Sequence, residues 1–199
     1  MNGQDSTFSD AEIRRALRSW LRVKHAAEAD TVVIEELGVC RGQARIDLAV
    51  VNGRFHGYEI KSDRDSLRRL GTQVDMYGKV LDLATIVVGD RHFTETLNAV
   101  PHWWGVLRFE SGPKGPQFKT VRPGWNNPRV DPRSLVELLW LDDAIALLTR
   151  RNVARGVRRK PRRIVWDRVC EHFEMHEIAA SVRAQLKARA ARKDLSSPS

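Results

Sequence analysis

The sequence predicts an α/β protein whose mixed sheet is flanked by helices and followed by a smaller helical region. Two observations carry this prediction. Helical periodicity and short β-branched runs alternate along the first half of the chain, in the order helix, three strands, helix, strand. The strand–helix–strand crossover favours parallel pairing, whereas the turn signal Asn52-Gly53 favours an antiparallel hairpin. A sheet that contains both kinds of pair is a mixed sheet.

The first expected helix covers residues 10–24. Ser9 followed by Glu12 fits a capping box, and Ile13 and Leu17 begin an apolar stripe with helical spacing. The elements that follow are expected as strands at 31–37, 44–51 and 55–61, a helix at 66–80, and a buried strand at 84–88. Together they predict the core of the fold.

The second half of the chain predicts a hairpin and then helices. Strands are expected at 103–109 and 118–121, around a loop rich in Gly and Pro. Residues 134–150 are amphipathic, and Ile178, Val182 and Leu186 mark a later helix. We therefore expect one domain over residues 1–125 and a basic helical subdomain over 126–199.

Composition limits the classes of function. Lys and Arg total 34 against 25 acidic residues, which gives a net charge of +9 and favours a polyanionic partner such as nucleic acid. Cys40 and Cys170 are isolated, so a structural zinc site is not expected. The N-terminus has no apolar signal core, and no apolar run reaches membrane-spanning length. We expect a cytoplasmic protein with no membrane partner.

The stretch RIDLAVVNGRFHGYEIKSD carries the chemistry. Asp47 lies inside an apolar strand, and Glu59 and Lys61 close the next strand. Hard cations such as Mg²⁺ take oxygen ligands, so two carboxylates on neighbouring strands indicate a metal site. Lys61 shares a face with Glu59 and could reach an attacking water or a phosphate. The alternative is that Glu59 and Lys61 simply end a strand in solvent.

The hairpin register tests this hypothesis. A two-residue turn at Asn52-Gly53 would place Asp47 opposite Tyr58 and put the carboxylates of Asp47 and Glu59 on opposite faces. A three-residue turn with a bulge at Gly53, or a bulge elsewhere in the hairpin, places them together. We therefore predict a bulge in this hairpin, and carboxylates on opposite faces would end the hypothesis.

These residues resemble the D…(D/E)xK signature of the PD-(D/E)XK nuclease superfamily. Gln73 and Tyr77 resemble the Q-x-x-x-Y element of its RecB-like members, and the pattern ELG…RID…GYEIKS…Q…Y…WWG is similar to a bacterial and phage family of small nuclease-like proteins. Ile46 stands where the signature has proline. The resemblance implies a restriction-endonuclease-like αβββαβ core and a DNA-cutting site that uses Mg²⁺, with Mn²⁺ as a substitute.

The resemblance also implies a third acidic metal ligand besides Asp47 and Glu59. Glu35 and Glu36 are the candidates, and we prefer Glu36 because it directly precedes the apolar Leu37. Gln73 and Tyr77 lie four residues apart on a helix, so they share a face and would contact the site or the substrate backbone. Ordinary packing is the alternative for both. Arg45 would bind phosphate or hold an acidic side chain.

Residues 150–168 are strongly basic, with Asp167 as their single acid. Such a segment, expected between helices, suits contacts to a phosphate backbone. A solvated loop or a subunit contact is the alternative. The residues assigned to nucleic-acid binding are Arg155, Arg158, Arg159, Lys160, Arg162 and Arg163, together with Arg45.

We therefore predict a metal-dependent deoxyribonuclease with Asp47, Glu59, Lys61, Gln73 and Tyr77 in the catalytic site. DNA repair, phage defence and mobile-element biology are all compatible settings, and a homodimer would allow cleavage of both strands. A non-cleaving nucleic-acid-binding module on the same fold is the alternative.

Overall fold

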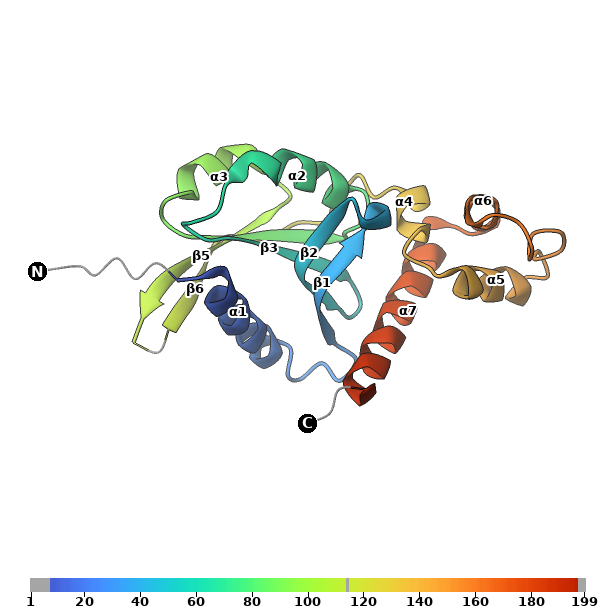
Figure 1. The fold of residues 1–199 in the computed structure, drawn as a ribbon, viewed down its shortest axis with the longest axis horizontal. Helices are drawn as coiled ribbons and strands as arrows, with labels where there is room; N and C mark the ends of the chain where they lie inside the picture. The colour runs from blue at the N-terminus through green and yellow to red at the C-terminus, as the bar shows by residue number, and fades with distance from the viewer. Residues whose placement is uncertain (1–7, 114, 197–199) are drawn as a thin grey trace, which may run out of the picture.

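A computed structural model describes residues 8–113 and 115–196 and contains one six-stranded mixed sheet (Figure 1). The strand order follows the sequence, β1-β2-β3-β4-β5-β6. The first three strands pair antiparallel, β3, β4 and β5 pair parallel, and β6 returns antiparallel to β5. The predicted fold class is confirmed. The strands are β1 (Val32–Val39), β2 (Ala44–Val51), β3 (Phe55–Lys61), β4 (Leu83–Val88), β5 (Gly105–Gly112) and β6 (Gly115–Arg122).

Helices cover both faces of the sheet (Figure 1). Helix α1 lies on one face, while α2 and α3 lie on the other. The remaining helices form the C-terminal region at one end of the sheet. The helices are α1 (Asp10–Lys24), α2 (Leu70–Gly78), α3 (Phe93–Ala99), α4 (Pro132–Val136), α5 (Leu141–Arg150), α6 (Arg162–His172) and α7 (Met175–Ser196), with short 3₁₀ turns η1 (Cys40–Gly42) and η2 (Leu67–Arg69).

Strand β3 shows why the sheet needs cover on both sides. Tyr58 and Ile60 pack with Ile13 and Leu17 of α1, whereas Phe55, on the opposite face, belongs to the larger cluster on the α2 side. Successive side chains of a strand point to opposite faces, so a strand buried on both sides reads as a nearly continuous apolar run. This larger cluster continues into α4–α7. The division of the chain at residue 125 stays a prediction.

The clearest element boundaries match the prediction. Helix α1 has the expected range, and Ser9 and Glu12 form both hydrogen bonds of the capping box. Strands β2 and β3 also have the expected ranges. Strand β1 starts one residue later and ends two residues later than expected, at Val39.

Four expectations about helices need correction. The helix expected at 66–80 begins as a 3₁₀ turn and ends at Gly78, and the helix expected at 134–150 is divided into α4 and α5. Helices α3 and α6 were not predicted. The basic segment does not lie wholly between helices, because α6 begins at Arg162. Its arginine-rich start hides the short apolar stripe formed by Val165, Trp166 and Val169.

No helix within residues 8–113 and 115–196 is long and apolar enough to cross a membrane.

Candidate functional site

The β2–β3 hairpin sets the register on which the site depends. Val51 pairs with Phe55, so the turn contains three residues, Asn52–Arg54, as one of the two predicted solutions requires. The predicted bulge is wrong, because the β2–β3 register shows no shift and Gly53 does not have a positive φ. The Asn52 side chain closes the turn instead: its Oδ1 accepts a hydrogen bond from the Arg54 amide at 2.9 Å.

This register, continued past the last paired residues, places Asp47 opposite Glu59. The ladder stops at Leu48 and Tyr58, and beyond it the Asp47 carboxylate takes the place of a strand partner. Its Oδ2 accepts a hydrogen bond from the Ile60 amide at 2.8 Å. Asp47 and Glu59 line the same pocket, so the geometric condition set by the sequence is met.

Glu59 is a buried carboxylate with three side-chain donors. Lys61 Nζ donates to Oε1 at 2.7 Å, Gln73 Nε2 donates to Oε1 at 2.5 Å, and Tyr77 Oη donates to Oε2 at 2.6 Å. Glu59 is 2% exposed and Lys61 is 5% exposed. The alternative of a strand end in solvent is therefore wrong. Gln73 and Tyr77 reach the site from α2, as their shared helix face predicts.

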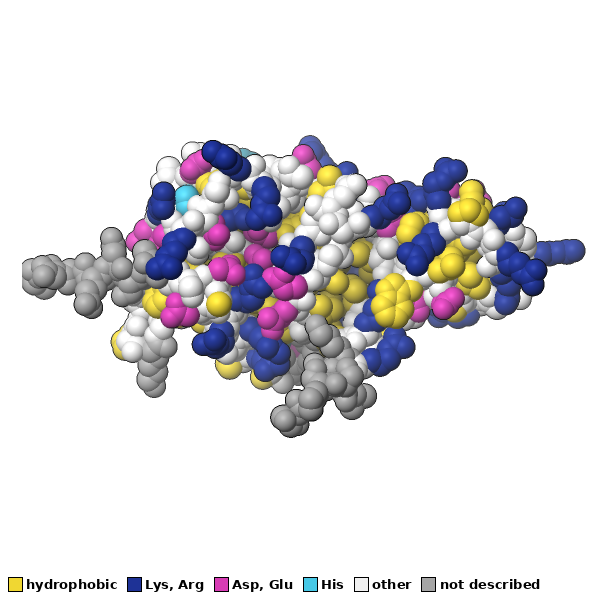
Figure 2. Space-filling model, in the orientation of Figure 1, with side chains coloured by type: hydrophobic (Ala, Val, Ile, Leu, Met, Phe, Trp, Pro, Cys, Tyr) yellow, Lys and Arg dark blue, Asp and Glu magenta, His cyan; other side chains and the backbone are white. Residues whose placement is uncertain are grey.

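The pocket that contains these groups has a volume of about 480 Å³. Figure 2 shows acidic and basic side chains interleaved on this part of the surface, between α1 and α2. Its lining includes Asp10 and Arg14 from α1, Arg45 and Asp47 from β2, and the end of β3, together with Gln73. Charged groups from α1, β2 and β3, and the amide of Gln73 from α2, thus meet at one end of the β2–β3 hairpin.

The carboxylates of Asp47 and Glu59 repel each other within the pocket. Burial and the neighbouring Glu59 raise the pKa of Asp47 to about 7, although the Ile60 amide and Arg14 act in the opposite direction. Burial and Glu59 also raise the pKa of Tyr77, which therefore stays a neutral hydrogen-bond donor. A bound cation would offset the repulsion between the carboxylates of Asp47 and Glu59.

The donor set fits a hydrated divalent cation on Asp47 and Glu59. Both supply carboxylate oxygens, and the buried Gln73 Oε1 has no hydrogen-bond partner among the described residues, so it could accept one from a ligand of the pocket. The structure does not bring Glu36 to them as a third ligand. One Glu36 oxygen contacts Arg14, and the other lies 2.5 Å from Arg45 Nε. Within the described residues, no group of three or more Asp, Glu, His and Cys side chains is arranged to hold a metal.

The sequence reasoning missed Arg14. From α1, its Nη2 lies 2.8 Å from Asp10 Oδ2 and 3.3 Å from Asp47 Oδ1, while Nη1 contacts Glu36. The only available signal was its spacing of four residues from Asp10, which any exposed helix can show. Arg45 holds an acidic side chain, Glu36, as one of its two predicted roles required.

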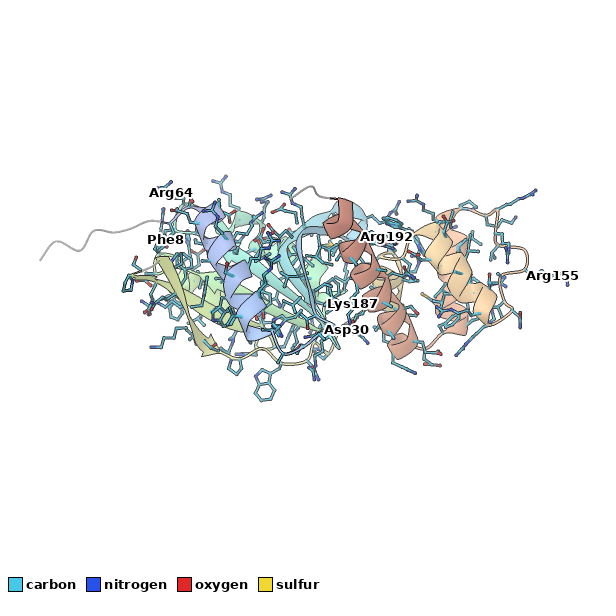
Figure 3. All side chains as sticks on the ribbon, turned by 90° about the horizontal axis from the view of Figure 1, so that it is seen from below. Phe8, Asp30, Arg64, Arg155, Lys187 and Arg192 are labelled. Atoms are coloured by element: carbon cyan, nitrogen blue, oxygen red, sulfur yellow. The ribbon has the colours of Figure 1, made fainter. Side chains whose placement is uncertain are left out.

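The basic residues of the C-terminal region lie apart from the pocket. Figure 3 shows Arg155 at the far end of the helical region, at the opposite end of the molecule from Phe8. In the same view, Lys187 of α7 reaches Asp30, which precedes β1, and the two form an ion pair. Within the part of the chain that the structure describes, the following exposed side chains form no ion pair: Arg155, Arg158, Arg159, Lys160, Arg162 and Arg163.

The fold and pocket define an α/β protein whose mixed sheet carries a buried carboxylate–lysine pair at the end of a β-hairpin. The chain belongs to the family of bacteriophage P4 protein cII, whose family model matches residues 3–196. It is 34% identical over 115 residues to protein cII of Enterobacteria phage P4. That match covers 58% of this chain and 43% of the phage protein, so it spans less than half of the relative's length. No solved structure matches.

Proposed function

We propose that this protein is a metal-dependent nuclease that hydrolyses DNA phosphodiester bonds, on a site of the PD-(D/E)XK type. The observation that supports this proposal is the buried network of Lys61, Glu59, Gln73 and Tyr77 beside Asp47, within one pocket. A buried ion pair does not by itself favour folding over a well-packed apolar pair. Its position in a polar pocket, next to a second carboxylate, favours a chemical role.

Each residue has a distinct task in this proposal. Asp47 and Glu59 would hold Mg²⁺ or Mn²⁺, which lowers the pKa of a bound water and neutralises charge on a phosphate. Gln73 and Tyr77 fix the orientation of the Glu59 carboxylate through one hydrogen bond to each oxygen. Lys61 Nζ donates to Glu59, and its other N–H donors could orient the attacking water or stabilise the phosphoryl oxygens.

A non-cleaving nucleic-acid-binding module is the second candidate. It is favoured by the contact of Arg14 with Asp47, because an internal counter-ion reduces the need for a metal there. The two candidates share the exposed basic residues of the C-terminal region as a surface for DNA. They differ in whether Asp47 and Glu59 bind a divalent cation.

The test is cleavage of linear, circular and single-stranded DNA with Mg²⁺ or Mn²⁺, each repeated with EDTA. We expect cutting that EDTA abolishes. Lys61→Ala should reduce the rate by about 10²- to 10³-fold, the range found when one transition-state donor is removed. Lys79→Ala is the matched control, because Lys79 is an exposed lysine that does not line the pocket. Salt-sensitive binding without cutting under any condition would support the second candidate instead.

A further inference from the structure

Two arginines hold one carboxylate beside the site pocket. Arg14 of α1 contacts one oxygen of Glu36, and Nε of Arg45 lies 2.5 Å from the other. The Glu36 side chain is 33% exposed and that of Arg45 is 69% exposed, so this cluster is open to solvent. A guanidinium group binds carboxylates and phosphates through the same planar set of donors. A carboxylate between two arginines therefore occupies a place that suits a phosphate.

The backbone of Glu36 adds a second observation. Its φ is +54°, in the left-handed region that residues with a Cβ rarely adopt. Its neighbours Glu35 and Leu37 pair with β2, whereas Glu36 itself has no partner in the ladder. Side-chain contacts with Arg14 and Arg45 thus accompany an unfavourable backbone conformation. Loss of those contacts would allow this residue to relax.

The cluster of Arg14, Glu36 and Arg45 lies beside the candidate catalytic residues. Arg14 also lies 3.3 Å from Asp47, so a single guanidinium group contacts both Asp47 and Glu36. Arg14 and Arg45 line the site pocket, while Glu36 lines a second hollow of about 750 Å³ between α1 and β1, together with Arg18 and Arg22. Glu36 therefore lies between the hollow and the site pocket.

We propose that Arg14 and Arg45 form a binding site for a backbone phosphate of the nucleic acid, and that the Glu36 carboxylate occupies this site until the substrate displaces it. This inference rests on the proposed function. It gives Glu36 a role different from that of the metal ligand expected from the sequence, and it adds Arg14 to the substrate-binding residues. The hollow between α1 and β1 is then the approach by which the strand reaches Asp47.

The experiment measures binding of a short fluorescent single-stranded oligonucleotide by anisotropy, in EDTA, so that neither metal nor cleavage contributes. Neutralising the internal competitor should tighten binding: E36Q is expected to lower Kd about fivefold, in line with the free energy of one partly exposed ion pair. E36G should act likewise, and glycine adopts the observed φ without a steric penalty. Arg14→Gln and Arg45→Gln should each weaken binding by a similar factor. Inorganic phosphate should displace the oligonucleotide from E36Q at lower concentrations than from the wild-type protein.

The control is E110Q, which removes the same charge from β5. Glu110 pairs with Arg108 and lines neither the site pocket nor the hollow between α1 and β1. An equal gain in E110Q, or no gain in either Glu36 variant, would overturn the inference. Loss of Mn²⁺ affinity in E36Q, measured by calorimetry, would show that Glu36 is a metal ligand and would also overturn it. If the Glu36, Arg14 and Arg45 variants change binding as expected but the wild-type protein cuts no DNA, the phosphate site is supported and the proposed nuclease activity is refuted.

Discussion

The buried carboxylate of Glu59 and the partly buried carboxylate of Asp47 have different numbers of hydrogen-bond donors. Glu59 accepts hydrogen bonds from three side chains, one of them the positively charged Lys61. Asp47 accepts one strong hydrogen bond, from the Ile60 amide, and a longer one from Arg14. Burying a charge is unfavourable unless partners replace its hydration, so the proton that relieves the repulsion goes to Asp47.

This difference predicts a pH dependence of stability. The pKa of Asp47 is about 7 in the folded protein, compared with an ordinary 3.8. Its contribution to the free energy of unfolding is therefore fully present below pH 3.8 and is lost as the pH rises through 7. His56 acts in the opposite direction, because burial lowers its pKa to about 3, so its contribution is lost as the pH falls below 6.5. The two effects offset each other in the wild-type protein near pH 5.

The measurement compares wild-type with Asp47→Asn by urea unfolding between pH 5 and 8, without divalent cations. The wild-type free energy of unfolding should vary little, whereas the variant should lose stability towards pH 5, because the opposing effect of Asp47 is then absent. The difference between the two proteins should change by roughly 2 kcal/mol over this range. Parallel profiles would show that Asp47 has an ordinary pKa.

At the scale of elements, the parallel part of the sheet depends on a close backbone approach. Gly105 begins β5, and a Cβ added there would lie 2.6 Å from Thr85 Oγ1 and 3.0 Å from the Gly124 amide nitrogen. Thr85 also hydrogen-bonds to His56 Nε2 at 2.8 Å, which joins this contact to β3. Only glycine therefore allows β4, β5 and the segment after β6 to approach this closely.

We expect Gly105→Ala to lower the free energy of unfolding by about 1–3 kcal/mol, the usual range for overpacking in a well-packed core. Gly71→Ala is the control, because a Cβ at this exposed position in α2 would have no atom within 4 Å. Alanine in a helix should raise stability there by about 0.5–1 kcal/mol. Urea unfolding of both variants is the measurement, and equal effects at the two positions would contradict the steric argument.

At the scale of the whole molecule, the candidate site and the exposed basic segment lie apart. The pocket is lined by residues of α1, β2, β3 and α2, whereas Arg155 lies at the far end of the helical region (Figure 3). A net charge of +9 would draw a polyanion to the protein in general. In the proposed function, the basic end would bind the phosphate backbone while the carboxylates of the pocket would hold the metal.

Neutralising Arg155, Arg159 and Lys160 together to Gln should weaken DNA binding and reduce its salt dependence. Each lost phosphate contact lowers the slope of log K against log salt by about 0.9 for duplex DNA, so we expect a decrease of about 2–3. Substituting the exposed Arg15, Lys119 and Arg129 in the same way gives a control with an equal change of net charge. Equal slopes in the two triple variants would show that the basic segment has no specific role in binding.

The sequence by itself determined the elements with strong local signals. The capping box at Ser9 and Glu12 fixes the start of α1, and the apolar runs around Asn52-Gly53 fix β2 and β3. The spacing of Glu59 and Lys61 within one strand, and of Gln73 and Tyr77 within one helix, also placed each pair on a common face. Such signals are local because backbone periodicity and turn chemistry act over a few residues.

Tertiary structure decided the contacts between distant segments. No local pattern shows that Arg14 of α1 would reach Asp47 and Glu36, or that Glu36 would bind arginines while Asp47 and Glu59 remain in the pocket. These pairings depend on how α1 packs across the sheet and on where β2 and β3 separate after Leu48. The pKa of Asp47 depends on the same arrangement, because burial and the approach of Glu59 arise only when the chain is folded.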